Sequence, residues 1–236
     1  ETAFTNWRPA ATPETITPPA AAPSKAIVYL IDAPDAPQSV IQVAVGLPPR
    51  REGDEVARRL FNMAFGGSFT ARVNMKLREE KGWAYGARSR ISGGRGPRMF
   101  VASSSVQTDK TAESLHELDL LLQAAAGGQP IDAKELTTAK GNLTLGLASD
   151  WSTGDGVASY LASQITERLP EDYFDHYADS ISAESLDATN EAGKALIAGR
   201  TLTWLVVGDR KRIEAKVRAL GLGEVRIVNT DGEPQL

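Results

Sequence analysis

The sequence predicts an α+β domain in which helices pack against a β-sheet. Two β-branched runs, 26–31 and 40–47, flank a proline-rich break, as two strands would. Apolar residues then recur at helical spacing over 54–65 and 70–81. Strands and helices are therefore grouped rather than strictly alternating, which favours an α+β layer of sheet and helices.

The remaining elements follow in order. Helix 54–65 is expected to end at Gly66-Gly67-Ser68, because glycine suits the left-handed cap position. Segments 83–91 and 99–106 form a hairpin around the glycine-rich turn SGGRGP. Three helical stripes come next: Leu115, Leu118, Leu122 and Ala125; Leu136, Leu143 and Leu147; Val157, Leu161, Ile165 and Leu169. Shorter helices over 171–181 and 183–198 precede a strand at 202–207, a helix at 211–220 and a strand at 225–228.

Composition narrows the class of protein. The chain has 236 residues, of which 42% are hydrophobic and 24% charged, as in ordinary globular proteins. A net charge of -4 gives no support for nucleic-acid binding. The absence of cysteine excludes disulfides, thiolate zinc sites and cysteine nucleophiles, and no apolar run approaches the roughly 20 residues of a membrane helix. We expect a soluble protein with no membrane partner, and bacterial periplasm and cytoplasm both remain open.

Four short sequence motifs occur in a characteristic order: DAPDAPQS at 32–39, GGSFTAR at 66–72, LREEKGWAYG at 77–86 and VVGD at 206–209. Together they resemble the pitrilysin-type zinc peptidases, the superfamily of insulin-degrading enzyme and mitochondrial processing peptidase. The resemblance implies a two-layer domain of the processing-peptidase-like metallohydrolase fold. Its sheet would be mostly antiparallel, with helices packed on one face.

The amino-terminal residues indicate the place of this chain in a longer polypeptide. Phe4-Thr5-Asn6-Trp7 resembles the F-x-x-W that closes one domain of this family, and 8–24 are rich in proline and alanine. We expect residues 1–24 to be the tail of a preceding domain and an extended linker. Residues 25–236 would then be a single carboxy-terminal domain, with its partner domain upstream.

The zinc motif of the family, HxxEH, is missing from the sequence. The only histidines are His116 and His176, and position 120 is leucine, so His116-Glu117 does not continue into a second ligand. Both histidines are expected on helix surfaces. Zinc is expected only in a partner catalytic domain that carries HxxEH.

Arg78 and Tyr85 are the candidate functional residues. A guanidinium donates up to five hydrogen bonds and a phenol one, and such donors stabilise negative charge that develops on a peptide carbonyl. The resemblance implies that both reach the backbone of a bound peptide near the zinc. Alternatively, Arg78 pairs with Glu79, Glu80 or solvent, and Tyr85 is a half-buried strand aromatic.

The loop before this helix has two interpretations. Gly67, Ser68 and Phe69 could line a peptide groove, since glycine lets the backbone approach a ligand closely. Alternatively, Ser68 or Thr70 caps the next helix.

Other singled-out residues are expected to be structural. Four arginines cluster in the hairpin: Arg88, Arg90, Arg95 and Arg98. They could face a peptide or an acidic partner, but we favour a solvated hairpin edge that charge protects from aggregation. Trp151 and Trp204 are expected to be packing residues.

The sequence thus predicts the non-catalytic, substrate-binding half of a zinc metalloendopeptidase, inactive alone, that closes over peptides. The alternative is a structural relative resembling the core subunits of a respiratory complex. A self-sufficient hydrolase lacks a nucleophile–base–acid set, because Ser103-Ser104-Ser105 has no GxSxG elbow.

Overall fold

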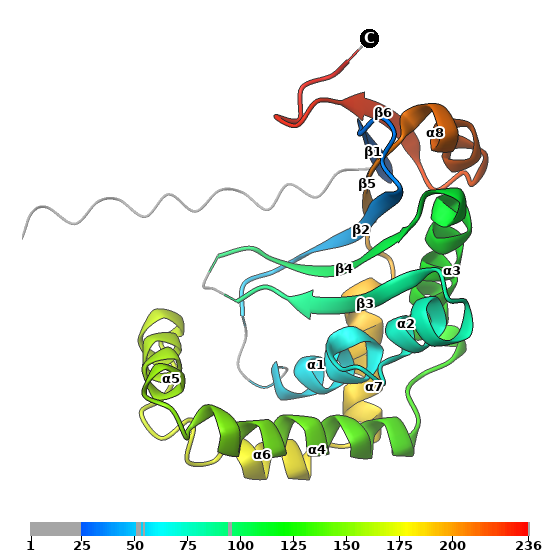
Figure 1. Cartoon of the computed structure of the whole chain (residues 1–236). Helices are drawn as coiled ribbons and strands as arrows, with labels where there is room; N and C mark the ends of the chain where they lie inside the picture. The colour runs from blue at the N-terminus through cyan, green and yellow to red at the C-terminus, as the bar shows by residue number, and fades with distance from the viewer. Residues whose placement is uncertain (1–24, 51–52, 54, 94–95, 236) are drawn as a thin grey trace, which may run out of the picture.

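A computed structural model of the chain describes residues 25–50, 53, 55–93 and 96–235 (Figure 1). The domain tail and linker predicted for residues 1–24 lie outside these described residues. Within them, no helix combines the length and the apolar character that crossing a membrane requires.

Six strands form one sheet in the order β3-β4-β2-β5-β1-β6. The strands are β1 (Ile27–Asp32), β2 (Gln38–Leu47), β3 (Ala84–Ile91), β4 (Arg98–Gln107), β5 (Thr203–Gly208) and β6 (Glu224–Val228). The β3–β4, β4–β2 and β2–β5 pairs are antiparallel, whereas β1 lies parallel to both β5 and β6. The predicted mostly antiparallel sheet is confirmed, and β3 is one of its edges.

The main helices are α1 (Glu55–Asn62), α2 (Arg72–Asn74), α3 (Thr111–Gln123), α4 (Ala133–Asp150), α5 (Gly154–Glu167), α6 (Tyr177–Ala183), α7 (Leu186–Ile197) and α8 (Arg210–Ala219). Helices α3, α7 and α8 contact the sheet from one face (Figure 1). The predicted two-layer α+β arrangement is therefore confirmed.

The core lies between this face of the sheet and its helices. Strand β2 alternates buried and more exposed residues, as expected for a strand with one covered face. Trp204 of β5 is fully buried, as are Leu115, Leu118 and Leu122 of the first predicted helical stripe. The packing role predicted for Trp204 is confirmed.

Two local expectations are wrong. Gly66 and Gly67 do not adopt a left-handed cap: they lie in a π-helical turn, Met63–Gly67, that continues α1 and ends at extended Ser68. The helix expected over 171–181 begins only at Tyr177, after turns. The predicted helical stripe does form a helix, α5, which carries Val157, Leu161 and Ile165 but no buried residue, and Leu169 lies just after its end.

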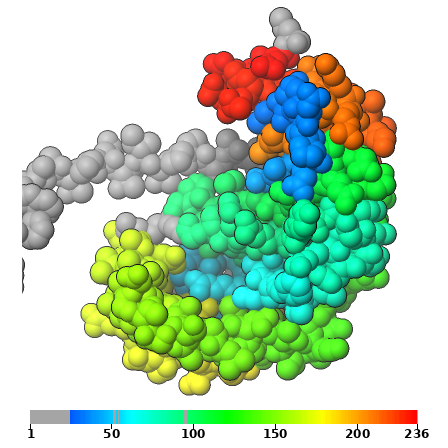
Figure 2. Space-filling view, viewed as in Figure 1, coloured from blue at the N-terminus to red at the C-terminus, as the bar shows by residue number. Residues whose placement is uncertain are grey.

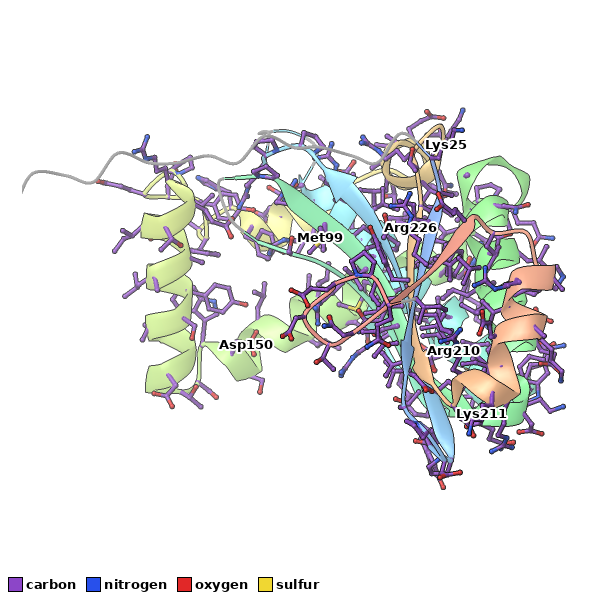
Figure 3. All side chains as sticks on the ribbon, turned by 90° about the horizontal axis from the view of Figure 1, so that it is seen from above. Lys25, Met99, Asp150, Arg210, Lys211 and Arg226 are labelled. Carbon is purple, nitrogen blue, oxygen red and sulfur yellow. The ribbon has the colours of Figure 1, made fainter. Side chains whose placement is uncertain are left out.

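Helices α4 and α5 form an arm that extends beyond the sheet. Asp150 marks the corner between them, and α5 stands off from the strands (Figures 1 and 3). The surface is hollowed between this arm and the sheet (Figure 2). At the corner Trp151, which is 41% exposed, stacks on Tyr160 with ring centroids 5.0 Å apart. Partial burial and the hydrogen bond to Asp150 raise the pKa of Tyr160 to about 12.

The motifs DAPDAPQS and VVGD are far apart in the sequence but meet at one end of the sheet. Asp32 Oδ1 accepts a hydrogen bond from the backbone N–H of Arg210 at 3.0 Å, and the N–H of Ala33 donates to the carbonyl of Gly208 at 2.8 Å. A side chain at Gly208 would overlap the buried Ser39, because its Cβ would lie 2.3 Å from the serine hydroxyl. DAPDAPQS and VVGD therefore fix the parallel β1–β5 pairing.

Candidate functional site

A cleft of about 630 Å³ opens beside strand β3. Strands β2, β3 and β4 and the segment before α2 all contribute to its walls. Its lining residues are Val40, Gln42, Gly66, Gly67, Ser68, Phe69, Asn74, Arg78, Tyr85, Gly86, Ala87, Arg88, Ser103, Ser104 and Ser105. All five site residues predicted from the sequence line this one cleft.

Arg78 lies in a π-helical turn, Met75–Glu80, that continues α2. Its guanidinium stacks over the ring of Phe69, 4.6 Å from the centroid, and its Nε lies 3.2 Å from Glu79 Oε1. Both members of this ion pair are about 40% exposed. The alternative pairing of Arg78 with Glu79 is thus present, but Arg78 still lines the cleft while it makes this ion pair.

Tyr85 stands at an irregularity in strand β3. The pairing of β3 with β4 shifts register between Ala84 and Ala87, and Tyr85 falls within the shift. Its side chain is 85% exposed and makes no hydrogen bond with the described residues, so the half-buried alternative is wrong. A bulge of this kind re-aims a side chain out of the regular ladder.

The loop from Gly67 to Phe69 forms another part of the cleft wall. Phe69 is 59% exposed, Ser68 is half-buried and Gly67 is exposed. The residue at the N-cap position of α2 is Ala71, without a side-chain hydrogen bond, so neither Ser68 nor Thr70 caps that helix. The capping interpretation is therefore wrong.

Asn74 is a positioning residue that the sequence reasoning missed. It is buried, its amide nitrogen donates to the carbonyl of Phe69 at 2.7 Å, and its oxygen accepts from the N–H of Ala87 at 3.0 Å. One side chain thus joins the loop to strand β3. Its place four residues before Arg78, on the same side of the helix, was the available signal.

Gly66 lets the turn that continues α1 approach strand β3 closely at Ser89. A Cβ there would lie 2.5 Å from Ser89 Oγ and 2.6 Å from its backbone nitrogen. The neighbouring Asn62 accepts a hydrogen bond from Ser89 Oγ at 2.8 Å. Arg72, the last residue of GGSFTAR, turns away and binds Glu135 of α4 at 2.5 Å. The motif therefore builds both the wall of the cleft and its support.

The two histidines are exposed and do not line the cleft, and only His116 lies on a helix, as was expected for both. His116 is exposed on α3, and His176 precedes α6, with Nε2 3.6 Å from Asp172. Among the described residues, no group of three or more His, Cys, Asp or Glu side chains gathers as a metal site would need. Ser104 Oγ donates to the carbonyl of Gly86 at 2.9 Å, so that hydroxyl serves the strand pairing.

A second cavity of about 500 Å³ lies between α1 and the end of α5. Three of its charged lining residues, Arg50, Glu55 and Glu167, are paired within the protein: Arg50 binds Glu167 and also donates to the Tyr173 hydroxyl at 2.9 Å. Glu55 accepts two hydrogen bonds from the buried Arg98, at 2.7 and 2.8 Å. The cleft beside β3, where Tyr85 and Arg88 are unpaired among the described residues, is therefore the better candidate for ligand binding.

Solved structures share this fold. The chain matches a peptidase M16 inactive domain from Pseudomonas fluorescens with a TM-score of 0.70 and 20% identity, over 80% of this chain and 45% of that one. A protease from Helicobacter pylori matches with a TM-score of 0.68 and 16% identity, over 76% and 43%. The periplasmic protease PqqL from Escherichia coli matches with a TM-score of 0.65 and 14% identity, over 78% and 21%.

This chain spans less than half the length of these three matched structures. No curated protein matches the sequence significantly. The sequence does match a family model, however, described as the peptidase M16 inactive domain, over residues 1–143. Those residues make up more than half of the chain and include the loop, Arg78 and Tyr85, so the chain belongs to the peptidase M16 inactive-domain family.

Proposed function

We propose that this chain is the substrate-binding, non-catalytic half of a zinc-dependent peptidase. The observation that carries the proposal is the convergence of Arg78, Tyr85 and the Gly67–Phe69 loop on one open cleft. Membership of the inactive-domain family agrees with a half that does not cut. Zinc and the general base would come from a partner domain that carries HxxEH, upstream in the same polypeptide.

The cleft suits a peptide backbone. Arg78 and Tyr85 offer hydrogen-bond donors without a competing partner for the phenol, and an extended peptide presents carbonyl oxygens along its length. Phe69 supplies an exposed apolar surface for a peptide side chain. Donors that are held before the substrate arrives cost little reorganisation when charge develops on the carbonyl oxygen.

The test uses the whole enzyme, that is, this domain together with its catalytic half. Arg78→Ala or Tyr85→Phe should lower the turnover of an unstructured fluorogenic peptide by roughly tenfold or more, because each removes a donor to the reacting region. Zinc content, measured by atomic spectroscopy, should stay unchanged. Arg212→Ala is the matched control, since Arg212 is exposed on α8. Undiminished turnover in both cleft variants would refute these residue roles.

The same peptide separates the proposal from its alternative. We expect no cleavage of the peptide by this chain alone and cleavage when it is mixed with the catalytic half. Cleavage by the chain alone would overturn the non-catalytic assignment. Association of the halves without cleavage would favour the structural relative.

A further inference from the structure

The four hairpin arginines do not form one cluster. Arg98 is buried against Glu55, and Arg95 lies outside the described residues. Arg88 and Arg90 are exposed on β3 and make no ion pair or hydrogen bond with the described residues. Since they are two residues apart on a strand, they lie on the same face, about 7 Å apart along it.

That face belongs to the cleft. Arg88 lines it and stands opposite Ser103, which stands opposite Gln42 on the next strand. The described lining contains two arginines and no carboxylate. A free guanidinium beside a hydroxyl and an amide is a donor set that fits a carboxylate.

Protection of the sheet edge does not account for these charges. The outer side of β3 is already closed, because Asn74 accepts from the N–H of Ala87 at 3.0 Å and Asn62 donates to the carbonyl of Ser89 at 3.4 Å. An edge covered in this way leaves few free backbone N–H and C=O groups for pairing with a strand of another molecule. The arginines point instead to a ligand on the open face.

We infer that the cleft selects peptides that carry an acidic side chain, recognised by Arg88 and reinforced by Arg90. The inference rests on the proposed function, since it assumes that a peptide lies in the cleft. Tyr85 lies in the bulge between Ala84 and Ala87, so Arg88 lies only about two residues of the facing strand β4 away from it, or about 7 Å along the strand. An extended peptide advances about 7 Å in two residues, so the favoured acidic residue should lie about two residues from the carbonyl held at Tyr85.

The experiment measures binding of fluorescein-labelled, unstructured decapeptides to the full chain by fluorescence anisotropy. Peptides differ only at one position, which carries Glu, Gln or Lys and is moved along the sequence. At the favoured position the Glu peptide should bind roughly fivefold more tightly than the Gln peptide, as expected for two partly exposed ion pairs. Raising the salt from about 50 to about 300 mM should shrink this ratio.

Variants locate the effect. The double variant Arg88→Gln/Arg90→Gln should bind the Glu and Gln peptides equally, whereas Arg212→Gln, which removes one exposed charge from α8, should keep the preference. The charge reversal Arg88→Glu/Arg90→Glu should favour the Lys peptide, which loss of folding would not produce.

The outcomes are distinct. Equal binding of the Glu and Gln peptides at every position would overturn the inference and leave the proposed function standing. A Glu preference that survives the double Gln variant would also overturn it, because other residues would then recognise the acid. Failure of every peptide to bind would overturn both proposals.

Discussion

Gly66 lies against Ser89 with no room for a side chain, which explains its presence better than any turn conformation does. Gly66→Ala should lower the free energy of unfolding by about 1–3 kcal/mol, because the new Cβ would overlap backbone as well as the hydroxyl. Gly141→Ala is the matched control: it lies in α4 with nothing within 4 Å of its Cβ. That change should raise the unfolding free energy by about 0.4–1 kcal/mol, and urea titration measures both. Two variants of equal stability would contradict the close approach.

Asn74 satisfies two backbone groups with one buried amide. Asn74→Ala leaves the carbonyl of Phe69 and the N–H of Ala87 without these partners, so we expect a loss of about 1–3 kcal/mol of unfolding free energy. Asn142→Ala, at an exposed position of α4, should change stability by less than about 0.5 kcal/mol. Hydrogen exchange at the Ala87 amide should accelerate in the Asn74 variant alone. An unchanged rate there would show that Asn74 does not position the cleft wall.

At the scale of elements, the buried Glu55–Arg98 pair joins the start of α1 to the start of β4. Burial by itself raises the pKa of Glu55, but the hydrogen bonds and charge of Arg98, aided by Arg50 and Arg58, outweigh it and hold the pKa below its ordinary value. A carboxylate with a depressed pKa in the folded state stabilises the fold above its unfolded pKa, about 4.3 for glutamate. This stabilisation is lost as pH falls through the folded pKa.

Glu55→Gln tests this linkage. At pH 6 the variant should be less stable than the wild type by about 3 kcal/mol, because Arg98 loses its charged partner in a buried site. Below about pH 4.3 the difference should narrow, because the unfolded wild type then takes up a proton at Glu55 before the folded wild type does, whereas glutamine takes up none in either state. Denaturant unfolding at pH 6, 4 and 3 measures both curves. Parallel curves would contradict the depressed pKa of Glu55.

Sequence patterns predicted the strands well because each combines a covered face with turn-forming breaks. They also placed Arg78 and Tyr85, through a motif rather than through spacing alone. The glycine cap was mispredicted because Gly66 serves a contact with Ser89, and long-range contacts leave no local pattern. Asn74 has a local signal in its place four residues before Arg78, but its two partners, Phe69 and Ala87, become neighbours only when α2 packs against β3.

The apolar stripe of α5 shows the same limit for the whole molecule. Helical spacing alone predicts an apolar face but not whether anything covers it. Ile165 is 76% exposed and Leu161 49%, whereas Leu118 at equivalent spacing in α3 is fully buried. Ile165→Ala should therefore change the unfolding free energy by less than about 0.5 kcal/mol, and Leu118→Ala should cost about 2–5 kcal/mol.

Helix α5, the outer part of the arm that it forms with α4, should open without the rest of the molecule (Figure 1). Helix α5 has no buried residue, so its hydrogen bonds gain little from tertiary packing. Strand β2 is paired on both sides and carries the fully buried Ile41 and Val43. In native-state hydrogen exchange, amides of α5 should exchange through local opening, and those of β2 only through global unfolding. Low denaturant should then accelerate exchange in β2 far more than in α5; equal acceleration would mean that the arm and the sheet unfold as one unit.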